Sequence, residues 1–119
     1  MGEESIFESV KNLLGVQEED TSFDQDILIH LNTVLSICTQ IGVGPDEGFI
    51  VTDNSQTWND FVRDSAKLSA VKSYVYLRVR RLFDPPLSSS VASANDDAIA
   101  ELEWRLNSTV EYDQGENSK

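Results

Sequence analysis

The segment from Leu68 to Pro86, LSAVKSYVYLRVRRLFDPP, constrains the fold of this chain more than any other part of it. Its apolar residues recur at steps of three and four, which places them on one face of an α-helix. They are Leu68, Val71, Val75, Val79 and Leu82. The alternation from Val75 to Arg80 also suits a strand, but we favour the helix. It should end at about Phe83, because Pro85 and Pro86 lack the amide hydrogen that a helix needs.

The same region concentrates positive charge in an acidic chain. From Arg63 to Arg81 there are six basic residues and one acid, whereas the whole 119-residue chain carries a net charge of −12. One line of helical steps comprises Arg63, Lys67, Tyr74, Arg78 and Arg81. In one interpretation, this whole line belongs to an interface with a second copy, in which Arg78 and Arg81 meet acids such as Asp97 or Glu101. In the other, this is a solvated face whose arginines pair with carboxylates of the same chain.

Two helices are expected before the basic segment. Residues 5–14 predict a short amphipathic helix with Ser5 as its N-cap and Gly15 as its end. Residues 24–41 predict a longer helix, capped by Asp24 or Ser22, whose apolar residues cover more than half of its circumference. The second helix should therefore contact other parts of the fold on more than one side.

The remaining helices follow two stretches of turn-forming residues. The glycines and proline of residues 42–48 predict a turn, and residues 49–51 a strand fragment or a packed loop. Thr57, followed three residues later by Asp60, resembles a capping box that starts a helix near residue 58. This helix runs on through Ala66 or breaks before Leu68. Residues 88–90 supply caps for a final helix that reaches about residue 107. The sequence predicts an all-α fold, a small bundle of four to five helices.

The end of the chain differs in composition from the rest. We expect residues 1–107 to form a single helical domain and residues 108–119 a flexible C-terminal tail, because these last residues have little apolar content. An extended chain would place Val110 and Tyr112 on one side, the pattern of a segment that docks on a partner. An unused disordered terminus is the alternative.

The residue types needed for catalysis or metal binding are sparse. His30 is the sole histidine, Cys38 the sole cysteine, and the acids Asp24 and Asp26 lack the rest of a calcium loop. The glycines of residues 42–48 are not followed by the Lys-Ser/Thr of a phosphate loop. We therefore expect no enzyme, no metal site and no cofactor, with Cys38 filling the core.

The charge and the apolar runs also limit the partners. A net charge of −12 repels nucleic acid and anionic membrane surfaces. The chain begins without a positive leader and contains no apolar run of membrane-spanning length. We expect a soluble protein made in a cytoplasm.

Four stretches, taken together and in order, resemble a known family. They are Asp26-Ile27 with Leu31-Asn32, Trp58-Asn59-Asp60-Phe61, VKSYVYLRVRRLFDPPLSSS from Val71 to Ser90, and IAELEWRLN from Ile99 to Asn107. This order is similar to that of the small head-tail connector proteins, also called head completion or adaptor proteins, of long-tailed bacteriophages. The resemblance covers roughly residues 20–107. The small residues from Ala92 to Asn95 depart from it, since bulkier helix formers are expected there.

The resemblance implies an all-α virion protein without catalytic residues, made in the cytoplasm of a bacterial host. Its copies would form a ring of about a dozen below the portal, around the channel through which the genome leaves. The implied partners are other copies, the portal protein and a downstream head-tail joining or tail protein. DNA would pass through without specific binding, and no membrane is involved.

Two other functions compete with this one. The first is a stand-alone helical protein-interaction module or regulator, in which the basic helix docks on an acidic partner. The second is a DNA-reading helical domain, which would use Tyr74, Arg78 and Arg81 on one face but is disfavoured by the net charge.

Overall fold

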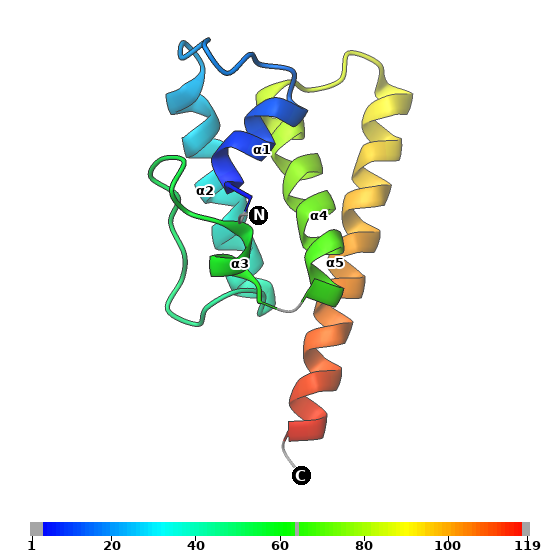
Figure 1. Ribbon diagram of the computed structural model, residues 1–119. Coiled ribbons are helices and arrows are strands. Elements are labelled where there is room, and N and C mark those ends of the chain that lie inside the picture. The colour runs from blue at the N-terminus through cyan, green and yellow to red at the C-terminus, as the bar shows by residue number, and fades with distance from the viewer. Residues whose placement is uncertain (1–3, 64, 118–119) are drawn as a thin grey trace.

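Five α-helices make up the computed structural model, which describes residues 4–63 and 65–117, with side chains for residues 4–63 and 66–107 (Figure 1). The helices are α1 (Ile6–Leu13), α2 (Asp24–Ile41), α3 (Trp58–Phe61), α4 (Ser65–Phe83) and α5 (Ser89–Asn117). Within the described residues there is no strand, only an isolated bridge between Ser5 and Thr57. The predicted all-α fold is confirmed.

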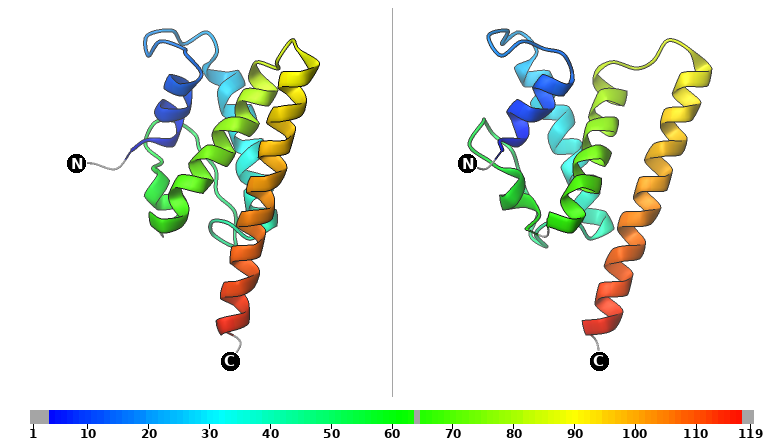
Figure 2. Two further views of the ribbon diagram at one scale, coloured as in Figure 1. Left: turned by 90° about the vertical axis from the view of Figure 1, so that its right-hand side faces the viewer. Right: turned by 45° about the vertical axis from the view of Figure 1, so that its right-hand side comes forward.

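The helix α4 occupies the middle of the fold. It packs against α2 on one side and α5 on the other, while α1 lies against α2 (Figures 1 and 2). The largest side chains that are completely buried come from α1, α2 and α4 together with Val51 of the loop; they include Ile6, Ile27, Leu31, Leu35, Tyr74 and Val75. The core therefore lies between these elements, and α5 covers one side of it.

The predicted start and end of α1 are confirmed. The Ser5 hydroxyl accepts a hydrogen bond from the Glu8 amide at 3.3 Å, as expected of an N-cap. The predicted cap of α2 is wrong. Phe23 occupies the N-cap position without a side-chain bond, because Ser22 turns back to Asp20 and Asp24 is already the first helical residue. At the other end, Gly42 closes α2 in the left-handed conformation, with φ 103°.

The loop between α2 and α3 is packed rather than strand-like. The Asn32 side chain accepts from the Val51 amide at 2.8 Å and donates to the Val51 carbonyl at 2.9 Å, which fixes the loop on α2. Gly44 has φ 89°, and a Cβ there would fall 2.5 Å from Cε1 of Phe61, so only glycine fits. The loop is thus held from both sides.

The capping box at the start of α3 is confirmed. Thr57 accepts from the Asp60 amide, and the Asp60 carboxylate accepts from the Thr57 amide. The helix ends after one turn because Val62 is extended, with φ −136° and ψ 116°. Of the two continuations predicted for this helix, the structure has the break before α4.

The helical interpretation of the basic segment is confirmed, and α4 ends at Phe83 as predicted. The predicted faces are partly wrong. Leu82 is 45% exposed, whereas Tyr74 from the basic line is completely buried. The reason is that α4 is covered from two sides, so that its buried surface is wider than a single apolar stripe.

The final helix is longer than predicted. It continues to Asn117, ten residues past the expected end, and its last turns extend beyond the other helices (Figures 1 and 2). No glycine or proline occurs between Leu87 and Gly115 to stop it. The flexible tail predicted for residues 108–119 and its docking on a partner stay predictions. The side chains of Val110 and Tyr112, which were predicted to dock, lie outside the described residues.

Candidate functional site

The basic line predicted on α4 leads to a polar cluster between α4 and α5. The buried Tyr74 donates its hydroxyl hydrogen to Oε2 of Glu103 on α5, at 2.7 Å. Arg78 donates to the same carboxylate oxygen through Nη2 and to the Tyr74 hydroxyl oxygen through Nε, the latter at 3.0 Å. The three side chains therefore satisfy one another inside a single copy.

The cluster changes the acidity of its members. Burial raises the pKa of Tyr74 well above its ordinary value, and the hydrogen bond to Glu103 adds to this. Burial alone would raise the pKa of Glu103, but the hydrogen bonds from Tyr74 and Arg78 outweigh it and hold this pKa below its usual value. Tyr74 thus stays neutral and Glu103 charged around neutral pH, which is the combination that the hydrogen bonds require.

Other basic residues of the same segment also have partners in the chain. Arg81 contacts Asp96 of α5, with 3.1 Å between Nε and Oδ1. Lys72 pairs with Glu4 and lies 5.8 Å from the centre of the Trp58 ring. Much of the positive charge of α4 is therefore neutralised within the chain.

The structure separates the residues predicted for a contact between copies. Arg63, Asp97 and Glu101 are exposed, Lys67 is half-buried, and Glu101 lies 3.7 Å from Arg105 on its own helix. Within one copy, no ion pair is described between Arg78 or Arg81 and the acids Asp97 and Glu101. Their pairing between copies stays a prediction, and it would require both arginines to leave their present partners.

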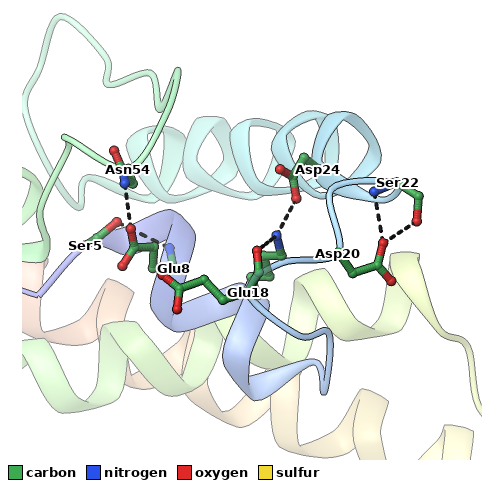
Figure 3. A network of polar contacts seen from close by, with 8 residues as sticks. Ser5, Glu8, Glu18, Asp20, Ser22, Asp24 and Asn54 are labelled. Atoms are coloured by element: carbon green, nitrogen blue, oxygen red, sulfur yellow. Dashed lines mark hydrogen bonds and ion pairs between the residues drawn. The ribbon is translucent and has the colours of Figure 1, made fainter.

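A second polar network joins α1, α2 and the loop between them (Figure 3). Nζ of the buried Lys11 lies 2.8 Å from Oδ1 of Asp24 and donates to the Glu18 carbonyl at 3.1 Å. Nearer the start of α1, Asn54 donates to Glu8 at 2.6 Å. The carboxylate of Asp24, one of the two acids considered for calcium, is thus paired with a lysine, which gives it a structural role.

The structure also describes the surroundings of the sole cysteine and of the acids. Burial raises the pKa of the Cys38 thiol to about 12, as for a side chain in the core. Among the residues that the structure describes, no three histidine, cysteine or acidic side chains gather where they could hold a metal ion. In that same part of the chain, no helix has both the length and the apolar character needed to cross a membrane.

Several exposed apolar residues were not singled out from the sequence. Trp104 is 70% exposed on α5, and Leu87 is fully exposed in the turn before it. Both lie inside stretches that carry the family resemblance. Helical spacing predicts which face of a helix is buried, but it does not show which exposed residues contact a partner. Ile99, Leu102 and Leu106 form one apolar stripe on a helix, and Trp104 falls on the opposite side. An aromatic residue at that position was the available sign of an exposed tryptophan.

A family described as phage connector protein matches residues 6–113, which is most of the chain. The chain belongs to the phage connector protein family. The resemblance inferred from the four sequence stretches is thereby confirmed. No curated protein and no solved structure matches the chain.

Proposed function

We propose that this phage connector protein is a structural component of the junction between head and tail in a long-tailed bacteriophage. The observation that carries the proposal is the family match over residues 6–113. Its copies form a ring of about a dozen below the portal, around the channel through which DNA leaves the head. The protein contacts the portal on one side and a downstream joining or tail protein on the other.

The charge distribution supports a conduit rather than a DNA-reading protein. The chain carries a net charge of −12, and Arg78 and Arg81 are engaged with Glu103 and Asp96. Tyr74, the aromatic residue of the alternative DNA-reading face, is completely buried. An acidic surface repels phosphates, so that DNA passes along it without being held.

The polar cluster between α4 and α5 suits a mechanical role. A subunit at this junction has to keep its shape while the particle is filled and emptied. The Tyr74–Arg78–Glu103 cluster and the Arg81–Asp96 pair link the two longest helices at two places. Two helices linked in this way fit a protein that acts by its shape and contacts.

The test is an early stop codon in the gene of the phage that encodes this chain. Without the protein, filled heads and complete tails should accumulate separately, and electron microscopy should show no joined particles. Expression of the protein from a plasmid should restore joining. Infectious, tailed particles in the absence of the protein would overturn the proposal.

A further inference from the structure

Trp104 lines a groove on the outside of the fold. The groove lies between the end of α2 and the middle of α5 and has a volume of about 470 Å³. Its lining consists of Ile37, Gln40, Ile41, Ala100, Glu103, Trp104 and Asn107. We call it the Trp104 groove. Four of these seven residues are apolar, so the exposed tryptophan does not stand alone, and exposed apolar surface of this kind marks interaction sites.

The Trp104 groove is held in a fixed shape. Glu103, which lies beside the tryptophan, is fixed by Tyr74 and Arg78 of α4. Leu106, two residues past the tryptophan, is buried in the core with 4% of its surface exposed. A partner therefore loses little free energy to ordering this surface when it docks.

The turn between α4 and α5, residues 84–88, presents a second apolar surface. Leu87 is fully exposed there, and Val91, one turn into α5, is half exposed. Pro85 and Pro86 restrict the backbone just before Leu87, and the Ser88 carbonyl accepts from the Ala92 amide at 3.0 Å just after it. We call this the α4–α5 turn; it offers Leu87 as a rigid apolar projection.

The charges of the two surfaces are complementary. Arg80 lines the α4–α5 turn; its guanidinium donates to the Tyr76 hydroxyl at 2.9 Å and, among the side chains that the structure describes, forms no ion pair. Asp84 is the other charged residue there. The only charged residue that lines the Trp104 groove is the acid Glu103. Oε2 of Glu103 accepts from Tyr74 and Arg78, whereas no described contact uses Oε1. A guanidinium that approaches the groove therefore meets this second oxygen and an exposed indole ring, which both attract cations.

We propose that the α4–α5 turn of one copy docks in the Trp104 groove of the next copy, with Leu87 entering the groove and Arg80 beside Trp104. This inference rests on the proposed connector role and specifies the surfaces that join its copies. Val91 and Trp104 are 13 residues apart on α5, or roughly 20 Å along a helix, so turn and groove are separate surfaces. Contacts between two different surfaces continue from copy to copy and can close into a ring.

Disulfide cross-linking between two variants, each with one added cysteine, tests the proposal. Leu87→Cys places a thiol on the turn and Ala100→Cys places one in the groove. The wild-type protein is the control, and its buried Cys38 should form no cross-link. Under mild oxidation, a mixture of the two variants should form a cross-linked pair containing one copy of each. Each variant alone should form at least about tenfold less cross-linked product.

Substitution of the tryptophan provides a second measurement. Trp104→Ala should weaken self-association about 30-fold, because buried tryptophans are frequent binding hot spots. Ile50, in the loop before α3, is 68% exposed and lies outside both surfaces, so Ile50→Ala is the matched control. Sedimentation velocity gives the association constants, and circular dichroism shows that both variants are folded.

The outcomes separate this inference from the connector role. Mixed cross-links together with weaker association of Trp104→Ala support it. It is overturned if the wild-type protein does not self-associate, if Trp104→Ala associates normally, or if each cysteine variant links to itself as well as to the other. Joined particles that still require the protein would then leave the connector role intact.

Discussion

The helices α4 and α5 lie side by side, yet they differ in which of their residues contact the same chain and which are exposed. On α4, apolar residues and most of the cations face other parts of the same chain. On α5, Ile99 and Leu106 are buried, while Val91 and Trp104 stay exposed. The difference follows from position, because α4 lies in the middle of the fold between α2 and α5, whereas α5 covers one side of the core. A helix at the edge of the fold is the one that has surface left for a partner.

The largest expected difference between the two helices comes from the same substitution made on each. Val75→Ala on α4 should lower the free energy of unfolding by about 2 to 3 kcal/mol, because it removes buried methyl groups and leaves a cavity. Val91→Ala on α5 should change it by less than about 0.5 kcal/mol, since that side chain is half exposed. Chemical denaturation measures both. Equal effects would contradict the assignment of α5 as the outer helix.

Substitutions in the polar contacts of the two helices allow a similar comparison, with smaller expected changes in the free energy of unfolding. Arg78→Ala should cost about 1 to 2 kcal/mol, because Tyr74 and Glu103 each lose a partner in a site that is about two-thirds buried. Glu101→Gln removes only an exposed contact within α5, 3.7 Å long, and should cost less than about 0.5 kcal/mol. Thermal unfolding of both variants is the measurement. A stable Arg78→Ala variant would mean that the cluster contributes little and that the arginine is available to another copy.

The helix positions could be predicted from sequence because spacing and caps are local. Ser5, Thr57 and the prolines after Phe83 each act on residues within one turn of themselves. Tyr74 could not be placed correctly, since its four-residue spacing from Arg78 also fits a polar face, and only the carboxylate of Glu103, 29 residues later, explains its burial. Nor could the partner of Lys11 be read from a helical pattern, because Asp24 lies beyond a loop.

Acid should weaken the contact between α4 and α5. The pKa of Glu103 is lower in the folded protein than its ordinary value, because hydrogen bonds from Tyr74 and Arg78 outweigh the effect of burial. The unfolded chain therefore takes up the proton first, and the stabilisation, present above the ordinary glutamate pKa of about 4.3, is lost as pH falls through the folded-state pKa. Between about pH 7 and pH 3, the stability difference between wild type and Glu103→Gln should shrink. A constant difference would show that this carboxylate does not titrate as described.

The smallest expected effect on stability comes from the end of α5. Deleting residues 108–119 should change the free energy of unfolding by less than about 0.5 kcal/mol, because this part extends beyond the other helices (Figure 2). If the segment docks on the portal, the same deletion should weaken binding of the protein to purified portal. Unchanged binding would show that the segment is not used for docking.

Cryo-electron microscopy of the assembled particle tests the central claim most directly. The account predicts a ring of five-helix subunits next to the portal, with Leu87 of each copy in the Trp104 groove of its neighbour. It also predicts that Arg78 bonds to Glu103 within each copy. A junction without this protein, or adjacent copies that meet through Arg78 while Trp104 faces solvent, would contradict it.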